Sequence, residues 1–301
     1  MFDKLKAMFR IGGAKIGMVE TLNRITDHPK IGVNTAEIDR IMDNKRIYKN
    51  KFPDVSYVNS DGMRMHRAFH SLNVSKVVSR KLAKLVFNDG CAISIDDDEA
   101  DQFLQSVFND NKFRKNFGEE LEAGYAIGGL VLRPYVDTKT NKIKISFCRA
   151  DTFYPLQSNT NDISEAAIAT ITQQTEGKKN VYYTLLEFHE WENSTYYIRN
   201  ELYRSEEQSQ TGVRVPLPTL DKYKELKEET ALVGFTRPLF VYIKLAGKNN
   251  IDIDSPLSLG IIDNAKRQLI DINEKYDEFM NEVEEARRKI LASDHFFKVR
   301  Y

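Results

Sequence analysis

The stretch from Asp254 to Leu291 has the most regular hydrophobic pattern in the chain. Its apolar residues step by three and then four positions for about four heptads, as in a helix with one buried stripe. The stripe consists of Ile262, Ala265, Leu269, Ile272, Tyr276, Phe279, Val283, Ala286 and Ile290. Ser255 suits an N-cap, and Pro256 suits the first helical turn, where its missing N–H needs no partner. The pattern predicts a helix of about 54 Å at about 1.5 Å per residue, which needs a second long element beside its stripe.

Helical spacing of apolar residues also dominates the chain before residue 129. Helices are predicted over residues 34–51, 64–88, 96–108 and 113–126. The first begins with the capping-box pair Asn34 and Glu37, and the third begins with an acidic run. The second ends before Asp89-Gly90, and the fourth ends before Gly128-Gly129. A short strand is predicted over 91–95. Residues 1–30 predict a loosely attached arm with a short helix broken at Gly12-Gly13.

After Gly129 the hydrophobic pattern changes to a period of two, with many β-branched and aromatic residues, which is typical of strands. The predicted strands cover residues 130–136, 142–149, 165–174, 181–191, 195–205 and 238–245, with a short helix over 220–230. Turn residues join consecutive strands, as at Glu192-Asn193-Ser194. The pattern therefore predicts an antiparallel meander.

Together these elements predict an α+β fold, with a helical N-terminal half, an antiparallel β-meander and then a long helix. We expect an arm over 1–33, a helical part over 34–129, the meander over 130–250 and the long helix over 251–301. The first candidate for the partner of the long helix is the predicted 64–88 helix, and the second is a neighbouring subunit. The final HFFKVRY resembles half of a strand, so we expect the natural chain to continue.

Composition narrows the classes of protein that fit. The 301 residues include 44 Lys or Arg and 44 Asp or Glu, so no overall basicity indicates binding to nucleic acid or an anionic membrane. Cys91 and Cys148 lack the spacing of a zinc site or a disulfide framework, and we expect two free, buried thiols in a reducing compartment. Charges interrupt every apolar run near the N-terminus, unlike in a signal peptide, and no stretch has the length of a membrane span.

Two clusters of metal-ligand residue types do not follow a metal-binding motif. His66 and His70 lie four residues apart, but a zinc-protease helix needs Glu directly after the first His, where this chain has Arg67. The acidic run over 96–99, with Asp101 and Asp110 nearby, lacks the glycine and terminal glutamate of a calcium loop. It is better explained as charge that complements a helix N-terminus. We therefore expect no metal and no cofactor.

One pair of residues has a geometry that general acid–base catalysis can use. Glu187 and His189 alternate onto one face of a predicted strand, next to Glu190. No nucleophile, oxyanion-binding glycine motif or second carboxylate on that face accompanies them, and Walker A, GxSxG and GxGxxG motifs are absent. An exposed polar strand face is the favoured interpretation, and we expect no enzyme.

Arg287, Arg288 and Lys289 form a basic tip in the last turn of the long helix, after an acidic middle. Their charge complements the negative C-terminal end of the helix dipole. The more specific interpretation is a surface that faces a partner, either a channel for DNA or a neighbouring subunit.

Several stretches, in order along the chain, resemble the portal proteins of phages of Gram-positive bacteria, which are also called minor capsid proteins. They are MHRAFHSLNVSKVVSRKLAKLVFNDG (65–90), FLQSVFNDNKFRKNF (103–117), GGLVLRPYVD (128–137), KISFCRADTFYPLQSNTNDISEAAIAT (144–170), YYTLLEFHEW (182–191), NELYRS (200–205), RPLFVYIK (237–244) and NNIDIDSPLSLGIIDNAKRQLIDINEKYDEF (249–279). The resemblance covers roughly residues 40–290. None of these stretches is a catalytic motif, so its specificity comes from its extent and order.

The resemblance implies a non-enzymatic virion protein. Its helical part and meander would form the wing of a head–tail connector ring, usually dodecameric, and the long helix would lead toward the stem around the DNA channel. Such a ring sits at one capsid vertex and is assembled in the host cytoplasm. It passes double-stranded DNA without sequence specificity during packaging and ejection. Its implied partners are its own copies, terminase, scaffold or major capsid protein, and head-completion or tail proteins.

Two other functions remain open at this point. The chain would also fit a capsid-associated minor structural or head morphogenesis protein that never encloses DNA. More distantly, it would fit a tail-associated hydrolase with Glu187 and His189 at its site. A ring with a central hole would distinguish the portal from both.

Overall fold

The computed structural model describes residues 21–59, 61–137, 139–158 and 162–296, and for 287–296 it describes the backbone alone. The chain divides into two compact units. The first unit holds the described residues up to Ile38, Val131–Ile243 and Asn249–Leu257, and the second holds Asp39–Leu130, Lys244–Lys248 and the described residues from Ser258 onward. Helices together with antiparallel sheets confirm the α+β class. The division into four segments by sequence stays a prediction.

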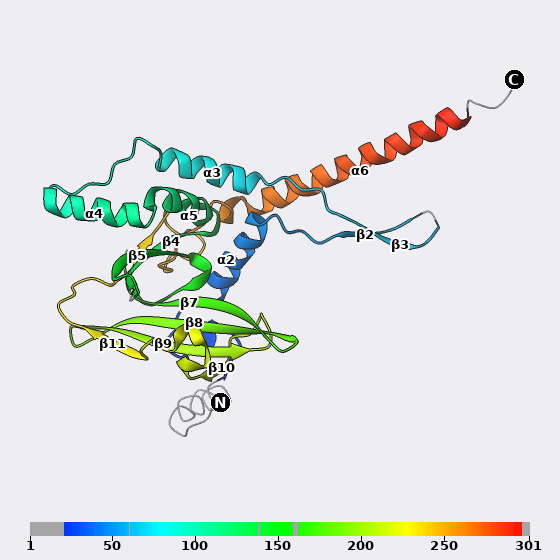
Figure 1. Cartoon of the computed structure of the whole chain (residues 1–301). Helices are drawn as coiled ribbons and strands as arrows, with labels where there is room; N and C mark the ends of the chain where they lie inside the picture. Colours follow the sequence, from blue (N-terminus) through cyan, green and yellow to red (C-terminus); the bar gives the residue numbers. More distant parts are fainter. Residues whose placement is uncertain (1–20, 60, 138, 159–161, 297–301) are drawn as a thin grey trace. The chain divides into compact units, whose positions relative to one another are not determined.

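The first unit is built around a seven-stranded sheet with the order β1-β10-β9-β8-β7-β6, in which β11 also pairs with β9 (Figure 1). Its strands are β1 (Thr21–Leu22), β6 (Phe153–Ser158), β7 (Ile163–Glu176), β8 (Lys179–Glu192), β9 (Thr195–Ser205), β10 (Gly212–Val215) and β11 (Glu229–Leu232). Antiparallel pairing joins β6 to β7, β7 to β8 and β8 to β9. The predicted antiparallel meander is therefore confirmed for β7 to β9, and β6, which was not predicted, extends it. The strands predicted over 130–136 and 142–149 belong to a separate sheet.

The turn between β8 and β9 fixes the register of the two longest neighbouring strands. Asn193 and Ser194 both have positive φ, 48° and 64°, the backbone that a two-residue type I′ hairpin loop requires. The register then pairs Glu192 with Thr195 and continues without a shift to Tyr182 and Ser205.

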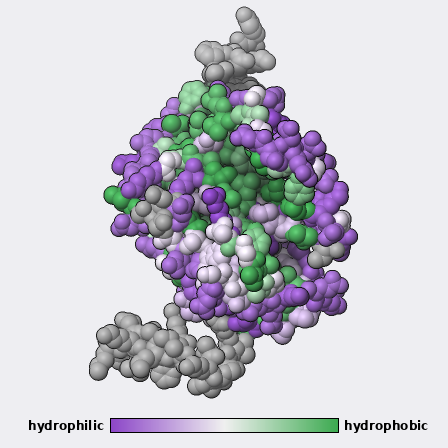
Figure 2. All heavy atoms as spheres, turned by 90° about the vertical axis from the view of Figure 1, so that its left-hand side faces the viewer, coloured by the Kyte–Doolittle hydropathy of each residue, from purple (hydrophilic) through white to green (hydrophobic). Residues whose placement is uncertain are grey.

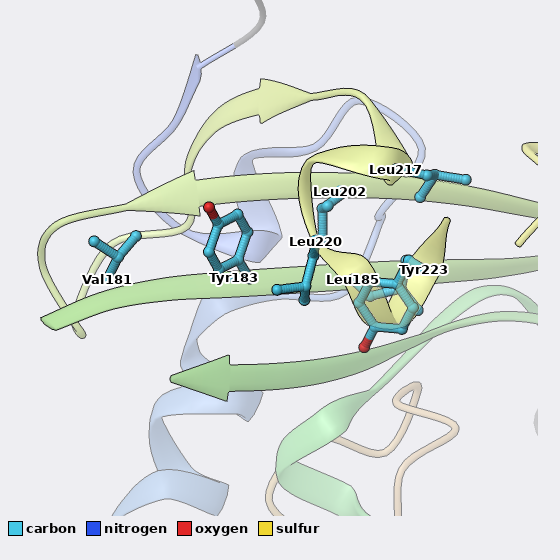
Figure 3. Packing of buried hydrophobic residues seen from close by; sticks show 7 residues of the cluster. All are labelled: Val181, Tyr183, Leu185, Leu202, Leu217, Leu220 and Tyr223. Carbon is cyan, nitrogen blue, oxygen red and sulfur yellow. The ribbon is translucent and has the colours of Figure 1, made fainter. Parts of the chain in front are cut away.

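A compact apolar cluster covers one end of this sheet (Figure 3). β8 contributes alternate residues, which share a face because strand side chains alternate, and two short 3-10 helices, η3 (Leu217–Thr219) and η4 (Asp221–Tyr223), cover them. The buried cluster comprises Val181, Tyr183, Leu185, Leu202, Leu217, Leu220 and Tyr223. The helix predicted over 220–230 is wrong, because the chain makes only η4 there and then adds β11 to the edge of β9.

A second sheet of the first unit has the order β12-β4-β5, formed by β4 (Leu130–Asp137), β5 (Lys142–Arg149) and β12 (Val241–Ile243). Aromatic rings connect it to the larger sheet: Phe153 of β6 packs edge-on against Phe240 at 5.5 Å and stacks on Tyr242 at 5.3 Å between ring centroids. These contacts hold β12 against β6, the edge strand of the larger sheet. The 3-10 helix η2 (Ala150–Thr152) directly precedes β6.

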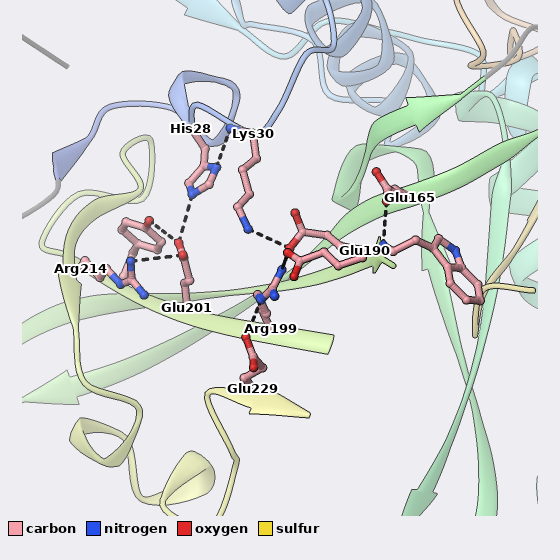
Figure 4. A network of polar contacts seen from close by, with 11 residues as sticks. His28, Lys30, Glu165, Glu190, Arg199, Glu201, Arg214 and Glu229 are labelled. Carbon is pink, nitrogen blue, oxygen red and sulfur yellow. Dashed lines mark hydrogen bonds and ion pairs between the residues drawn. The ribbon is translucent and has the colours of Figure 1, made fainter. Parts of the chain in front are cut away.

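The segment before residue 33 is attached to the large sheet by ion pairs (Figure 4). His28 lies 3.1 Å from Glu201, and Lys30 lies 2.8 Å from Glu190. Arg199 joins the same network through Glu190 and Glu229. The expected loose arm is thus wrong for the residues after 20, which form β1 and the 3-10 helix η1 (Ile25–Asp27). The helix expected at Gly12-Gly13 lies outside the described residues.

The second unit contains most of α2 (Thr35–Tyr48), the hairpin of β2 (Val55–Val58) and β3 (Arg64–Arg67), and the helices α3 (Val74–Val86), α4 (Asp98–Asp110) and α5 (Phe113–Ile127). The 3-10 helix η5 (Asp263–Ala265) precedes the long α6 (Lys266–Phe296). The predicted helices near 34–51, 96–108 and 113–126 are confirmed, with Asp97 as the N-cap of α4 and Gly128 in the left-handed conformation after α5.

Two predictions for the second unit are wrong: the 64–88 helix starts later than expected, and the 91–95 strand does not form. The 64–88 segment starts as β3 and becomes helical only at Val74, after Asn73 accepts the N–H of Lys76 as an N-cap. No strand forms over 91–95, where side chains of Arg114 and Gln105 bind the backbone carbonyls of Cys91 and Ile93 instead. Side chains thus take the acceptors that a partner strand would have used.

The long helix starts later than Ser255 and Pro256 predict. Ser255 donates its hydroxyl to Glu37 at 2.8 Å and accepts the N–H of Leu257 at 3.3 Å, so it closes a turn and does not begin a helix. Regular α-helix begins only at Lys266. Between Ser255 and Lys266 the chain makes tertiary contacts instead of regular α-helix.

Candidate functional site: the mount of the long helix

The segment that leads into α6 is buried in the second unit before the helix begins. Ser258, Leu259 and Ile262 are at most 2% exposed. A run of irregular backbone tolerates such burial only when its polar groups find partners. We call residues 258–266 the mount of α6.

Two glycines allow the mount to touch the end of α5 backbone to backbone. A Cβ on Gly260 would lie 2.1 Å from the carbonyl oxygen of Ala126, and a Cβ on Gly128 would lie 2.7 Å from that of Ser258. Gly128 also has a φ of 107°, which a side chain would strain. The close approach thus requires glycine on both sides.

Hydrogen bonds across this contact satisfy groups that a helix end leaves free. Ile261 donates its N–H to the carbonyl of Tyr125 at 2.8 Å, and the hydroxyl of Ser258 donates to the carbonyl of Gly128 at 2.9 Å. The C-terminal end of α5 is therefore capped by the chain entering α6.

Ion pairs from α2 fix the other side of the mount. Arg40 pairs with Asp263 at 2.5 Å, and the Asp263 side chain, 1% exposed, also accepts the N–H of Gly260 at 2.7 Å. Lys266 pairs with Asp43 one turn further along α2. A buried carboxylate is tolerated because a cation and a backbone donor satisfy it.

Beyond the mount, a polar face of α6 holds the segment that leads from β3 to α3. Asp277, 5% exposed, accepts both branches of the Arg67 guanidinium at 2.6 and 2.7 Å and the N–H of His70 at 2.9 Å. Asn273 accepts the N–H of Leu72 at 2.7 Å. The hydrogen bonds from Arg67 hold the pKa of Asp277 below its ordinary value. The face of α6 that is covered within the unit is therefore polar.

The exposed part of the apolar stripe of α6 lies about a third of a turn from this polar face, at about 3.6 residues per turn. Ile272 is 47% exposed, Phe279 59% and Val283 38%. The prediction that the 64–88 segment covers this stripe is wrong, because residues 67–72 bind the polar face instead. Ile262 of the stripe is buried, Leu269 and Tyr276 are half-buried, and the three residues above form an exposed hydrophobic surface among the described residues.

The pair Glu187 and His189 does share a strand face, but the prediction that this face is exposed is wrong. Glu187 is 7% exposed and His189 only 1%. Arg133 of β4 places its guanidinium on both carboxylate oxygens of Glu187, and His189 Nε2 lies 2.7 Å from Oε1. Arg133 is 54 residues from Glu187 in the chain, so no local motif indicates this contact.

Hydrogen-bond roles in this network follow from its outermost donor. Leu239 donates its N–H to the Tyr196 hydroxyl at 2.9 Å, and the hydroxyl lies 2.6 Å from His189 Nδ1. The hydroxyl therefore donates to Nδ1, which leaves the hydrogen on Nε2 to donate to Glu187. Burial opposes ionisation of Glu187, but His189 and Arg133 together lower its pKa to about 2. Every partner is used internally, so the network serves as a tie between the two sheets of the first unit.

The remaining sequence candidates for chemistry are separate from one another. His66 lies on β3 and His70 beyond it, not on the helix that their spacing suggested. The side chains described here contain no group of His, Cys, Asp and Glu that could hold a metal ion. Cys91 and Cys148 are free, as predicted, but each is half-buried and not fully buried as expected, and partial burial raises the pKa of the Cys148 thiol. Arg287, Arg288 and Lys289 lie on α6, but their side chains are outside the described residues.

A surface cavity of about 640 Å³ lies beside α4 and α5 in the second unit. Phe87, Phe108 and Phe113 contribute to its wall, together with Arg114, whose guanidinium stands over the Phe87 ring. Figure 2, which shows the side where α4 lies in Figure 1, has hydrophobic side chains gathered among hydrophilic ones. Arg114 donates to the backbone of Asn88 and Cys91, so this cation supports the wall of the cavity.

Comparison with known proteins gives one family. Residues 27–300 match the family model described as "Phage portal protein, SPP1 Gp6-like". A search of curated proteins finds no match. Among the residues with described structure, no helix is long and apolar enough to cross a membrane. The matched range contains the mount, the Glu187 network and every described strand except β1.

The first prediction concerns Glu187. Glu187→Gln should lower the free energy of unfolding by about 2–3 kcal/mol at pH 7, because Arg133 loses its buried partner. The folded pKa of about 2 lies below the ordinary 4.5. The contribution is therefore complete above the unfolded pKa and is lost as pH falls from 4.5 toward 2, so the gap between wild type and variant should close in acid.

Urea unfolding of both proteins between pH 7 and pH 3 measures this gap. Glu192→Gln on the same strand is the matched control, because its ion pair with Arg199 is exposed, and it should change stability far less. Equal effects of the two substitutions would contradict the assignment of Glu187 as the buried tie.

The second prediction concerns Asp277. Asp277→Ala removes the acceptor for Arg67 and for the N–H of His70. Amide hydrogen exchange of residues 67–72 should accelerate by roughly tenfold or more, since the segment loses its attachment to α6. Glu278→Ala, one residue further along, removes only an exposed pair with Lys275 and should leave exchange unchanged. Unchanged protection in the Asp277 variant would show that this segment is held by other contacts.

Proposed function

Because the chain belongs to the SPP1 Gp6-like family of phage portal proteins, we propose that it is the subunit of a portal ring at one vertex of the capsid, through which DNA is packaged and ejected. The family match over residues 27–300 carries this proposal. The ring, usually dodecameric in such proteins, would be assembled in the bacterial host cytoplasm and remain in the virion.

The structure supports this proposal through the way α6 is held. A 31-residue helix fixed at its N-terminal end by the mount acts as a rigid extension of about 46 Å at about 1.5 Å per residue. We infer that it leads from the wing toward the stem of the ring. We propose that the described fold forms the wing, with the helical part over 34–129 and the meander over 130–250 as its divisions.

The proposed role needs no chemistry from this chain. The one buried cluster of acid and base that the sequence singled out, Glu187 with His189, is saturated by Arg133 and Tyr196. We propose that the protein is not an enzyme and that ATP hydrolysis for packaging belongs to terminase. Further proposed partners are scaffold or major capsid protein and head-completion or tail proteins.

Contact with DNA would be independent of sequence and weak. Tight binding of phosphates through many Lys and Arg side chains would oppose movement of the duplex, and base contacts would stop it at particular sequences. The balance of 44 basic and 44 acidic residues fits this requirement.

The third prediction is that the complete gene product forms rings. Negative-stain electron microscopy should show particles with a central hole, and native mass spectrometry should give a single multiple of the subunit mass. A stable monomer across the micromolar range would contradict the portal assignment and favour a capsid-associated structural or morphogenesis protein that does not enclose DNA.

The fourth prediction concerns the basic tip of α6. We propose that Arg287, Arg288 and Lys289 face the channel or a neighbouring subunit. Replacing all three with Ala should lower the yield of DNA-filled heads at least tenfold, measured by quantifying packaged DNA after complementation of a portal-deficient phage. Replacing Glu274, Glu278 and Glu282 with Gln in the acidic middle is the matched control. A normal yield of full heads from the basic-tip variant would overturn the assignment.

A further inference from the structure

The hairpin of β2 and β3 extends away from the helices of the second unit (Figure 1). None of the residues of its two strands is buried. An isolated two-stranded hairpin is marginally stable in water and normally needs a surface to pack on. A hairpin that lacks such a surface in its own subunit requires an explanation.

The tip of this hairpin is nevertheless well built. The side chain of Asn59 accepts the N–H groups of Asp61 and Met63 at 3.1 and 2.8 Å, and its backbone N–H donates to the carbonyl of Met63 at 3.0 Å. Gly62 supplies the positive φ, 77°, that this turn requires.

The base of the hairpin is fixed as firmly. Phe52 and Phe69 pack with ring centroids 5.1 Å apart, and Asn50 donates to Ser71 at 2.8 Å. Arg67, the last residue of β3, forms the two-branched ion pair with Asp277 of α6. The hairpin is therefore a positioned arm with an ordered tip and a fixed base, and none of its strand residues is buried.

Register divides the arm into an apolar and a polar face. Val55 pairs with Arg67 and Tyr57 with Met65, whereas Ser56 pairs with His66 and Val58 with Arg64. Residues directly opposite each other share a face. One face therefore presents Val55, Tyr57 and Met65 beyond the anchored Arg67. Tyr57 and Met65, which lie directly opposite each other on this face, are each 40% exposed.

The apolar stripe of α6 is the second uncovered hydrophobic surface that the same unit holds in a fixed position. Its exposed residues Ile272, Phe279 and Val283 span about 16 Å at about 1.5 Å per residue. A four-residue strand spans about 10 Å from its first to its last residue at about 3.4 Å per residue. The stripe is therefore long enough to accommodate the strands of the hairpin.

Charge also favours contact between the two surfaces. From Lys266 to Ala286, α6 carries seven Asp or Glu residues and three Lys or Arg residues. The hairpin strands carry Arg64, His66 and Arg67 and no acidic residue. A basic ribbon approaching an acidic helix gains in the rate and orientation of encounter.

We propose that the apolar face of the β2–β3 hairpin of one copy packs on the apolar stripe of α6 of a second copy. Within one copy, Arg67 holds the base of the hairpin at Asp277 and the strands extend away from α6 (Figure 1), and Ile272, Phe279 and Val283 stay exposed. The contact uses different surfaces on the two partners, so each copy still offers one hairpin and one stripe. Repetition of such a contact closes into a ring or continues as a filament.

This inference rests on the proposed function, because the portal ring supplies the neighbouring copy. It goes further by naming the surfaces through which neighbours meet. Ring formation through other surfaces would leave the proposed function intact and remove only this contact.

Cysteine pairing between different copies tests the contact. Met65→Cys is placed in one full-length copy and Phe279→Cys in another, the two are co-expressed, and assembled particles are oxidised. The expected result is a covalent dimer containing one copy of each variant, with peptide mapping assigning the disulfide to the introduced thiols. The parent protein, with Cys91 and Cys148 only, gives the background.

The matched control replaces Met65→Cys by Val58→Cys, which lies on the other face of the same hairpin. The apolar-face pair should give at least tenfold more covalent dimer than the control pair. Tyr57→Cys with Val283→Cys is a second pair, used if either first variant fails to assemble. Rings that form without a covalent dimer above the control overturn this inference alone, and a full-length protein that forms no rings overturns it together with the portal assignment.

Discussion

The contact between the backbone of Gly260 and the carbonyl of Ala126 sets the position of the long helix. No side chain fits at either Gly260 or Gly128, so the chain that enters α6 lies directly against the end of α5. Ile261 and Ser258 cap that end, and Asp263 then receives Arg40 and the N–H of Gly260. These contacts fix the chain before regular helix begins at Lys266, and along α6 itself Asn273 and Asp277 then bind the segment over 67–72. Backbone contacts of this kind fix direction more narrowly than flexible side chains do.

The surface of α6 divides its contacts in an unusual way. Asn273 and Asp277, which are polar, hold the chain's own segment, and Ile272, Phe279 and Val283, which are apolar, remain exposed. Burying a large apolar side chain stabilises a protein by about 1.5–3 kcal/mol. Burial of the exposed residues of the stripe and the hairpin at an interface would therefore contribute a substantial free energy of association. The same contact repeated between every pair of neighbours would make a ring strongly cooperative, while a single subunit stays folded through its polar mount.

Regular elements were predictable from the sequence where periodicity was strong and turns were explicit. The strands β4, β5, β7, β8 and β9 and the helices α2, α4 and α5 follow from periodicity, from the Asn193-Ser194 turn and from the acidic run and Gly128 at helix ends, whereas β6 was not predicted. The start of α6 was misplaced because Ser255 and Gly260 serve tertiary contacts with Glu37 and Ala126, which local signals do not report. The hairpin was missed because its strands have only four residues each and mix apolar with polar residues. The sequence Asn59-Ser60-Asp61-Gly62 could have indicated the turn of the hairpin, and Asn73 could have indicated the start of α3.

The candidate site shows the same limit more sharply. Glu187 and His189 share a strand face as alternation predicts, but their burial depends on Arg133 and Tyr196, which come from other strands. The resemblance to portal proteins was visible in the order of many stretches, and the family match over residues 27–300 agrees with it. Which faces of α6 are covered was not visible, because a heptad stripe predicts burial without naming the partner. The polar face could be recognised only once residues 67–72 were placed against it.

The most direct test of this account is an electron cryomicroscopy structure of the assembled full-length protein at a resolution that shows side chains. The account predicts a closed ring in which the Gly260 backbone lies against Ala126 in every subunit and the stripe of Ile272, Phe279 and Val283 is covered by the hairpin of the next subunit. A ring in which that stripe faces solvent, or in which α6 leaves the mount in a different direction, would contradict it.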